Sequence, residues 1–436
     1  MIMLYDFIMN KMVWKARWTG EQIRAMLLEQ MEAFWRRDTG IERERLADVE
    51  RAAALPHAVI VSGLRRVGKS TLLAQMAHRL GQESFYYLNF EDERLLGFAA
   101  QDANDLYQTL VEIFGERKIF FLDEVQNVAD WERFVRRFMD LGFKFYITGS
   151  NASLLSRDLG TRLTGRYVPI ELLPFSFREF LVFKNIKIPD GQPLTTTGSA
   201  LLNASLNEYQ RSGGIPEALK YPELSILRTL YDDVLYRDIA ARYRLEGVQT
   251  LRELAYLLMS NPAGQVNYNK LKAQFQLGSV NTIRSYIESM ENSWLLFSIR
   301  RFDFSLKRQQ IAPKKVYCID TGLVNAVGFR FSPNSGKLLE NLVFLALRRR
   351  TRDIFYYITP GGYEVDFYLP ETGQFIQVAQ DLSSPVTRER ETRALEDAAG
   401  AMKMERMLIL SDRNEDEFRI GDLPVQVRST AEWLLE

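Results

Sequence analysis

The sequence predicts an α/β protein with a parallel sheet in its first half, and three observations lead to this prediction. Short apolar runs, each long enough for one buried strand, alternate with stretches of helical periodicity between residues 51 and 175. A glycine-rich loop joins the first of these runs to a helix. Residues 364–380 form two alternating apolar runs around a turn, which is typical of a β-hairpin and predicts a second α/β domain.

Length and composition set the class of protein. The 436 residues are enough for about two to four domains of ~100–200 residues each. Because 56 basic residues balance 56 acidic ones, any nucleic-acid or membrane surface has to be local. One cysteine and two histidines exclude a disulfide framework and a cysteine-based zinc site, so metal chemistry would rest on carboxylates. The sequence shows neither the order of a signal peptide nor an apolar run of ~18 residues, so we expect a cytoplasmic protein without a membrane partner.

The strongest signal is residues 58–80, AVIVSGLRRVGKSTLLAQMAHRL, which match G-x-x-x-x-G-K-[ST] between an apolar strand and a helix. Gly63 and Gly68 allow backbone N–H groups to surround phosphate oxygens at a helix N-terminus. Lys69 is expected to reach the β- and γ-phosphates, and Ser70 to offer a hydroxyl to Mg²⁺. The fold predicted here is therefore that of a P-loop NTPase. The expected nucleotide contacts in this loop are Gly63, Arg65, Arg66, Val67, Gly68, Lys69, Ser70 and Thr71.

Two further strands carry polar residues at their carboxyl ends. KIFFLDEVQ (118–126) ends in Asp123, which can hold Mg²⁺ together with Ser70, and in Glu124, which can polarise an attacking water and so implies hydrolysis. KFYITGSN (144–151) ends near Ser150, where a sensor of the γ-phosphate would lie. An ordinary Gly-Ser turn would give the same pattern there.

Several arginines are candidates for stabilising phosphate charge. Arg162 and Arg166 lie between the fourth and fifth strands, where an arginine of a ring-forming ATPase contacts the γ-phosphate of the neighbouring subunit. Arg157 is the weaker candidate, because Gly165 and Arg166 open the fifth strand; a solvated helix face is the alternative for all three. Arg65 and Arg66 could neutralise phosphate charge or form ion pairs at the sheet edge.

In this order, the motifs resemble those of the bacterial and archaeal AAA+-type ATPases whose C-terminal half is a domain of unknown function. The matching segments are GLRRVGKST, FFLDEVQ, ITGSNASLLS, GRYVPIELLPFSFREFL, GGIPEAL, YRDI, YCIDTGL, KLLENLVFLALRRR and GYEVDFYL. The resemblance covers nearly the whole chain and implies ATP binding and hydrolysis with Mg²⁺. A trans-acting arginine needs a head-to-tail neighbour, so we expect a homo-oligomeric ring, with a hexamer as the first expectation.

The middle of the chain is predicted to be helical from about residue 176 to 246, as a lid. Residues 187–200 are rich in Pro, Gly and Thr and predict a surface loop. Gly213, Gly214 and Pro216 predict a turn between two helices. In related ATPases such a turn packs on the adenine, which makes Pro216 a candidate for that contact; a plain helix–helix turn would look the same.

Residues 251–302 predict a helix-turn-helix followed by a strand, the pattern of a winged helix. Side chains of the types that contact DNA follow the tight turn and lie in the strand. They are Asn281, Thr282, Arg284, Arg300 and Arg301. Because winged helices also pack against proteins, and because this one has little basic excess, DNA and a protein partner both remain possible.

The C-terminal segments follow the order of a PD-(D/E)XK nuclease: a helix with Glu340, a hairpin with Asp366, a third strand, a helix and a strand. Gln377 and Ala379 stand where such a nuclease has its second carboxylate and its lysine, so we expect a nuclease fold without nuclease chemistry. Lys337, one helical turn before Glu340, is a possible substitute, although lysines at helix starts are usually solvated.

These inferences combine into five predicted regions: 1–50, an N-terminal helical segment; 51–175, the AAA+-type core; 176–246, the lid; 247–312, the winged helix; and 313–436, the restriction-endonuclease-like domain. The predicted function is an ATPase that couples nucleotide state to conformational change in an oligomer. The alternatives are a nucleotide-gated adaptor for DNA or protein with slow turnover, and an ATPase-linked nuclease.

Overall fold

The computed structural model divides the chain into two compact units, residues 1–172 and 173–436. Part of the predicted N-terminal segment and part of the predicted loop at 187–200 lie outside the described residues. The residues that the structure describes are 19–155, 157–187, 195–223, 225–243, 245, 247–328, 335–402, 406–412 and 415–436.

The first unit contains a five-stranded sheet in the order β2-β3-β4-β1-β5. All neighbouring strands are parallel, as the sequence predicts, so their carboxyl ends meet at one edge of the sheet. The central strands are almost continuously buried, which is why they appear in the sequence as uninterrupted apolar runs. The strands are β1 (Ala58–Ser62), β2 (Phe85–Asn89), β3 (Ile119–Asp123), β4 (Lys144–Gly149) and β5 (Tyr167–Glu171).

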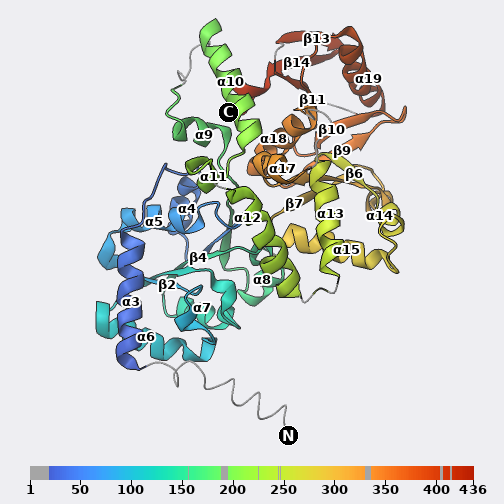
Figure 1. Cartoon of the computed structure of the whole chain (residues 1–436). Coiled ribbons are helices and arrows are strands. Elements are labelled where there is room, and N and C mark those ends of the chain that lie inside the picture. The colour runs from blue at the N-terminus through green and yellow to red at the C-terminus, as the bar shows by residue number, and fades with distance from the viewer. Residues whose placement is uncertain are drawn as a thin grey trace. The chain divides into compact units, whose positions relative to one another are not determined.

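Helices of the first unit pack around this sheet (Figure 1). The first of them begins at Thr19 with a capping box, in which the Thr19 hydroxyl accepts from the Gln22 N–H and the Gln22 side chain accepts from the Thr19 N–H. The helices are α3 (Gly20–Trp35), α4 (Leu46–Ala53), α5 (Lys69–Leu80), α6 (Ala103–Phe114), α7 (Trp131–Asp140) and α8 (Arg157–Arg162).

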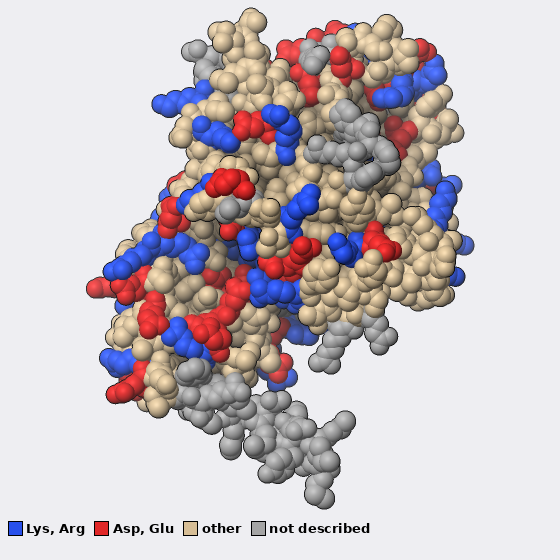
Figure 2. All heavy atoms as spheres, in the orientation of Figure 1, with Lys and Arg blue, Asp and Glu red and all other residues tan. Residues whose placement is uncertain are grey.

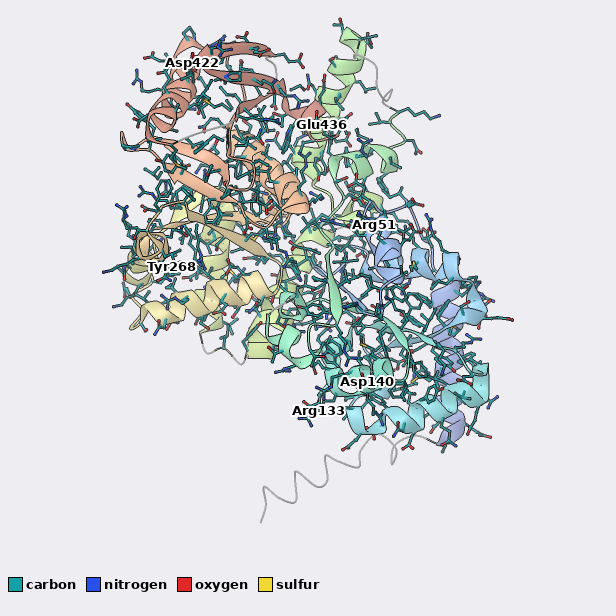
Figure 3. All side chains as sticks on the ribbon, turned by 180° about the vertical axis from the view of Figure 1, so that it is seen from behind. Arg51, Arg133, Asp140, Tyr268, Asp422 and Glu436 are labelled. Atoms are coloured by element: carbon teal, nitrogen blue, oxygen red, sulfur yellow. The ribbon has the colours of Figure 1, made fainter. Side chains whose placement is uncertain are left out.

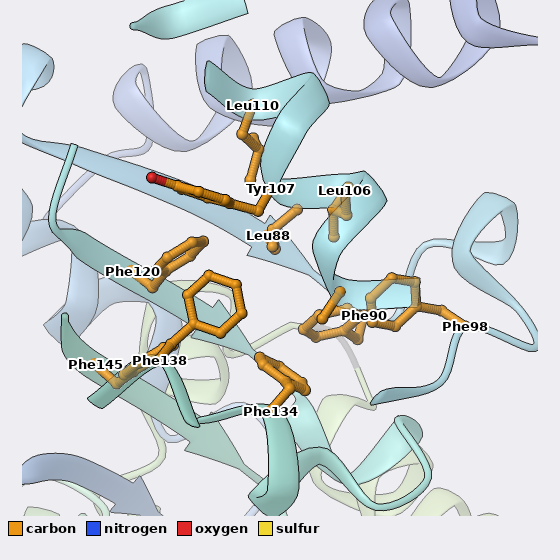
Figure 4. Close-up of a pocket in the computed structure, with 11 residues that line it drawn as sticks. Leu88, Phe90, Phe98, Leu106, Tyr107, Leu110, Phe120, Phe134, Phe138 and Phe145 are labelled. Atoms are coloured by element: carbon orange, nitrogen blue, oxygen red, sulfur yellow. The ribbon is translucent and has the colours of Figure 1, made fainter. Parts of the chain in front are cut away.

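One side of the sheet is covered by an aromatic core that encloses a small cavity between α6, α7 and strands β2, β3 and β4 (Figure 4). The cavity has about 10 Å³ of room for the centre of a water molecule, and apolar side chains form nearly all of its lining. A water needs two to four polar partners, so this small apolar cavity does not suit an ordered water.

The second unit begins with helices and contains a turn that only glycine can form. Gly213 has φ of +72°, and a Cβ placed on it would lie 2.1 Å from Asp320 Oδ1. Asp320 Oδ2 accepts from the Gly214 N–H at 2.7 Å, so this buried carboxylate fixes the turn. The helices are α9 (Phe177–Phe183), α10 (Thr196–Ser212), α11 (Pro216–Lys220), α12 (Ile226–Asp233), the π-helical η7 (Val234–Ala241) and α13 (Val248–Ser260).

The three helices and the strand expected between residues 251 and 302 are present in this order. They are α13, α14 (Tyr268–Gln274), α15 (Val280–Asn292) and β7 (Leu296–Arg301). β7 pairs antiparallel with β8 (Lys314–Cys318), and β8 pairs with β6 (Gly264–Val266). The connection between β7 and β8 contains α16 (Leu306–Ile311). Helix α17 (Thr321–Val327) follows β8.

The last part of the chain completes a nine-stranded sheet in the order β13-β14-β12-β11-β10-β9-β7-β8-β6. The predicted hairpin is formed by β10 and β11, which are antiparallel, and β11 is parallel to β12. β7 pairs with β9, which joins the segment of residues 247–312 to the C-terminal strands in one sheet. These elements are α18 (Ser335–Arg350), β9 (Phe355–Ile358), β10 (Glu364–Leu369), β11 (Gln374–Ala379), α19 (Pro385–Ala401), β12 (Arg406–Ser411), β13 (Asp416–Ile420), β14 (Leu423–Ser429) and α20 (Thr430–Trp433).

Within the part of the chain that the structure describes, every helix is too short or too polar to cross a bilayer. On the face shown in Figure 2, basic and acidic side chains are interspersed, in keeping with equal numbers of each in the sequence.

Candidate nucleotide-binding site

The phosphate-binding loop lies between β1 and α5, at the carboxyl edge of the first sheet. Gly68 adopts φ of +94° directly before α5, a backbone conformation that favours glycine. A Cβ on Gly63 would lie 2.1 Å from the Leu172 carbonyl oxygen, so only glycine allows the two backbones to approach. Lys69, Ser70 and Thr71 form the first turn of the helix, whose free N–H groups favour an anion.

Arg43, to which the sequence interpretation gave no role, donates a hydrogen bond to the backbone of this loop. Arg43 is only 4% exposed, and its Nη1 donates to the Val67 carbonyl at 2.6 Å. Since the C=O and N–H of a trans peptide point in opposite directions, this bond turns the Gly68 N–H away from Arg43. Gln75 of α5 fixes the backbone of the arginine's loop, accepting from the Arg43 N–H at 3.2 Å and donating to the carbonyls of the preceding residues 39 and 41.

Asp123 ends β3 beside the loop and is 2% exposed. Its carboxylate accepts hydrogen bonds from the Tyr87 hydroxyl at 3.0 Å, from the Thr148 hydroxyl and from Ser70. Burial, followed by the negative charge of Glu124, raises the pKa of Asp123, although these hydrogen bonds oppose the shift. Ser70 and Asp123, the two predicted metal ligands, are therefore in direct contact.

Glu124 lies between the lysine and a glutamine. Lys69 Nζ is 3.2 Å from Glu124 Oε1, and Gln126 Nε2 donates to Glu124 Oε2 at 2.5 Å. The Glu124 N–H donates to the Thr148 hydroxyl at 3.1 Å, and its φ of +53° turns the side chain out of the line of β3. Burial raises the pKa of Glu124, but the charge of Lys69 and these hydrogen bonds outweigh burial, so the pKa is lowered and the side chain is ionised at neutral pH.

Ser150 is placed in the same network through Gln126, a second residue to which the sequence interpretation gave no role. Gln126 Nε2 is 3.3 Å from Ser150 Oγ as well as in contact with Glu124. A Cβ on Gly149 would lie 2.3 Å from Gln126 Oε1, so the glycine makes room for the glutamine. The only signal for Gln126 in the sequence was its position two residues after Glu124 in FFLDEVQ.

The two arginines of the loop differ in their surroundings. Arg65 Nη1 forms an ion pair with Glu91 Oε1 at 3.1 Å, and its charge helps to lower the pKa of Glu124. Arg66 is exposed and adopts φ of +64°, whereas Val67 is fully buried.

Arg162 and Arg166 contact α7 instead of the phosphate-binding loop. Arg162 Nη1 is 2.9 Å from Glu132 in the first turn of α7, and Arg166 Nη1 is 2.6 Å from Asp140 at its end, which is labelled in Figure 3. The Arg166 carbonyl accepts from the N–H of Ala58, the first residue of β1. Arg166 thus lies at the amino edge of the sheet, opposite the loop. The side chain of Arg157 is outside the described residues, and Pro216 is the first residue of α11 in the second unit.

The residues of the loop fit a metal that arrives with phosphates. Among the described residues there is no group of three or more His, Cys, Asp and Glu side chains that could hold a metal alone. Ser70 and Asp123 offer one hydroxyl and one carboxylate, and Mg²⁺ is commonly bound by one or two carboxylates with the remaining ligands from phosphates and water. The site therefore suits Mg²⁺ as a nucleotide complex.

The fold and this site define an AAA-type P-loop ATPase domain, and comparison with known families agrees. A family described as "AAA domain" matches residues 56–181, and one described as "Domain of unknown function (DUF8612)" matches residues 203–334. The uncharacterized protein MJ1544 of Methanocaldococcus jannaschii is 34% identical over 379 residues, which is 83% of this chain and 84% of that protein. The chain belongs to the same family as this archaeal protein.

Other relatives extend the comparison. An uncharacterized protein of Haemophilus influenzae is 32% identical over 74% of this chain and 82% of its own length. Among solved structures, the Walker-type ATPase of Pyrococcus abyssi is 15% identical with a TM-score of 0.43, over 67% of this chain and 99% of that chain. The Aeropyrum pernix Orc1 protein in complex with DNA is 12% identical with a TM-score of 0.32, over 68% of this chain and 95% of that chain.

Proposed function

We propose that the chain binds ATP with Mg²⁺, hydrolyses it and couples the nucleotide state to conformational change in an oligomer. The observation that carries this proposal is the position of Glu124. An ionised carboxylate lies 3.2 Å from the lysine of the phosphate-binding loop and follows directly on Asp123, which contacts Ser70. Nucleotide binding requires only the phosphate-binding loop, whereas hydrolysis also requires a group such as the Glu124 carboxylate to orient the attacking water.

Each residue has one role in the proposed reaction. Lys69 binds β- and γ-phosphate oxygens, while Ser70 and Asp123 hold Mg²⁺. Glu124 accepts a hydrogen bond from the attacking water and takes up its proton as the water oxygen bonds to the γ-phosphorus. The bond between that phosphorus and the oxygen bridging to the β-phosphate breaks, giving ADP and phosphate. Gln126 holds Glu124 beside Ser150, which we assign as the sensor of the γ-phosphate.

The test compares binding with turnover. Lys69→Ala should abolish nucleotide binding, whereas Glu124→Gln should keep binding and lose phosphate release in the steady state. Glu91→Gln, a carboxylate that pairs with Arg65 of the loop, is the matched control and should keep both. If Glu124→Gln hydrolyses ATP at the wild-type rate, the assignment of water activation is wrong.

We also propose that Arg162 or Arg166 acts on the nucleotide of a neighbouring subunit in a ring. Support comes from Arg166, which lies at the amino edge of its own sheet, where it can face a head-to-tail neighbour and not its own loop. Sedimentation with Mg²⁺ and a slowly hydrolysed ATP analogue should show an oligomer, with a hexamer expected. A monomer under these conditions would leave both arginines as surface residues.

A second candidate function is a nucleotide-gated adaptor on DNA, for which the supporting observation is a small local excess of basic residues. Residues 247–312, the predicted winged helix, contain eight Lys and Arg but four Asp and Glu, a net charge of +4 in a chain whose total is zero. The basic residues include Arg284 on α15 and Arg300 on β7, both exposed. Stimulation of turnover by duplex DNA, with binding that weakens steeply as salt rises, would support this function. Turnover that is indifferent to DNA would favour a protein partner.

For the C-terminal elements we propose a nuclease-like arrangement without nuclease activity. The order of α18, β9, β10, β11, α19 and β12 supports the arrangement. Gln377 and Ala379 lack the carboxylate and the ammonium that hold metal and hydroxide in such a site. No cleavage of single- or double-stranded DNA is expected with Mg²⁺ or Mn²⁺. Cleavage with Mn²⁺ that is lost in Asp366→Ala would contradict this proposal.

A further inference from the structure

A buried lysine of the second unit contacts three acidic side chains. Lys315, in β8, is 1% exposed. Its Nζ lies 2.6 Å from Glu340 Oε1 on α18, 2.6 Å from Glu364 Oε1 and 3.0 Å from Asp366 Oδ1, both on β10. An ammonium has three N–H donors, and this one has an oxygen for each of them. We call these four residues the Lys315 cluster.

Further hydrogen bonds connect the cluster to its neighbours. The Tyr317 hydroxyl donates to Glu340 Oε1 at 2.7 Å, and Gln265 Nε2 donates to Glu364 Oε2 at 2.5 Å. Asp366 Oδ2 accepts from the Val378 N–H at 2.9 Å, so both oxygens of Asp366 are engaged. Tyr317, Gln265 and Val378 of the second unit thus each donate one hydrogen bond to a carboxylate of the cluster.

Gln377 extends the arrangement in a way that a carboxylate could not. Its Oε1 accepts from the Asp366 N–H at 3.1 Å, while its Nε2 donates to Glu391 Oε2 of α19 at 2.5 Å. A glutamate at this position would have no donor for Glu391 and would add a further negative charge beside Asp366. Ala379, two residues on, is buried in the apolar cluster that includes Leu395 of α19. Gln377 and Ala379, which stand where a nuclease has a carboxylate and a lysine, thus fit the hydrogen bonding and packing around them.

A divalent metal does not fit here. Lys315 already occupies the space between the carboxylates that a nuclease would use for metal, and within the described ranges no group of acidic, His or Cys residues could hold one. A metal bound at Asp366 would have to displace the ammonium, which is 1% exposed, from its three acidic partners.

We propose that the Lys315 ammonium is the built-in cation of this cluster, taking the place of a divalent metal, so that the second unit assembles without metal. Lys337, the alternative that the sequence suggested, is not part of the cluster, because its Nζ donates to Asn261 Oδ1 at the surface. The proposal goes beyond the ATPase function and does not depend on it.

The protonation states agree with this geometry. Burial and then the charge of Asp366 raise the pKa of Glu340 to about 8. The pKa of Lys315 is raised well above its ordinary value, because the negative charge of Asp366 and its neighbours outweighs the effect of burial.

The test is unfolding of the full chain in urea, without nucleotide, in EDTA and in millimolar Mn²⁺. Wild type should unfold at the same urea concentration in both solutions. Lys315→Met should lower the midpoint of the second unit by about 1–2 M, since it leaves buried carboxylates without a cation. Mn²⁺ should restore part of this loss, and the double variant Lys315→Met/Asp366→Asn should lose the restoration. Lys314→Met is the matched control, because Lys314 is the neighbouring residue of β8 and lies over the ring of Tyr268, labelled in Figure 3.

A second measurement covers the case in which Lys315→Met does not fold. Mn²⁺ binding is counted by electron paramagnetic resonance in wild type and in Asp366→Asn, and the two counts should be equal. If Asp366→Asn binds one Mn²⁺ fewer than wild type, the proposal is overturned. It is also overturned if Mn²⁺ raises the urea midpoint of wild type but not that of Asp366→Asn. An unchanged midpoint in Lys315→Met would overturn it as well.

Discussion

The ion pair between Lys69 and Glu124 predicts that removing the glutamate's charge tightens nucleotide binding. Lys69 is 4% and Glu124 13% exposed, and their charged atoms are 3.2 Å apart. With an effective dielectric constant of about 20, the Coulomb attraction at this distance is about 5 kcal/mol. A nucleotide phosphate that binds Lys69 must compete with this attraction, and it also meets the negative charge of Glu124.

Glu124→Gln keeps the size of the side chain and one oxygen for Gln126 but removes the charge. Much of the attraction is retained in the wild-type complex, because Glu124 stays near Lys69 when phosphate binds. We therefore expect the substitution to strengthen binding by about 1.4 kcal/mol. This corresponds to a roughly tenfold lower Kd for a non-hydrolysable ATP analogue in the presence of Mg²⁺. Salt should reduce the difference only weakly, since the pair is buried.

The assay is a titration followed by fluorescence of a labelled analogue, in wild type, Glu124→Gln and the control Glu91→Gln. Glu91 pairs with Arg65 and is 44% exposed, so its substitution should change the Kd less than twofold, as expected for an exposed pair. If Glu124→Gln binds the analogue as weakly as wild type or more weakly, the ion pair does not compete with phosphate and the reasoning is wrong.

Three further predictions follow from contacts outside the reacting groups. Arg43→Met removes a charged hydrogen bond to the Val67 carbonyl, so it should weaken nucleotide binding by about 1–2 kcal/mol, or about tenfold, in the same titration. Arg79→Met on the surface of α5 is the control and should leave binding unchanged. Equal affinities of the two variants would refute the role of Arg43. Lys144 donates to three backbone carbonyls at 2.7 Å each, so Lys144→Met should lower the free energy of unfolding of the first unit by about 2–4 kcal/mol in urea, and a loss no greater than that of Lys118→Met would contradict this. Burial raises the pKa of Asp320 from 3.8 to about 6, so its contribution to stability is present below pH 4 and is lost as pH rises through 6. The free energy of unfolding of wild type minus that of Asp320→Asn should therefore fall by about 2–3 kcal/mol between pH 4 and 7, and a constant or rising difference would contradict the shift.

The parallel sheet, and the grouping of most candidate site residues at one edge of it, could be predicted from the sequence because their signals are contiguous. The loop from Gly63 to Ser70 and the pair Asp123 and Glu124 each lie within a few residues of a strand end. Parallel strands bring their carboxyl ends to one edge, so the proximity of Asp123 to Ser70 follows from the fold alone.

Other site residues could not be predicted in this way. Arg43 reaches Val67 across 24 residues, and its role depends on how the chain before α4 folds over α5. Lys315 and Asp366 are 51 residues apart in sequence, on strands that periodicity can place in a sheet but not face to face. Lysine opens β8 twice, at 314 and 315, and the sequence gives no sign that only the second is buried.

The most direct test of the central claim is single-turnover release of the γ-phosphate, with enzyme in excess over Mg²⁺–ATP so that product release does not limit the rate. Wild type should convert bound ATP to ADP and phosphate. Glu124→Gln, although saturated with ATP, should be slower by about 100- to 1,000-fold, the contribution of a positioned base. Bound ATP that stays intact in wild type, or equal rates in wild type and Glu124→Gln, would contradict the assignment of this site as an ATPase centre with Glu124 as its base.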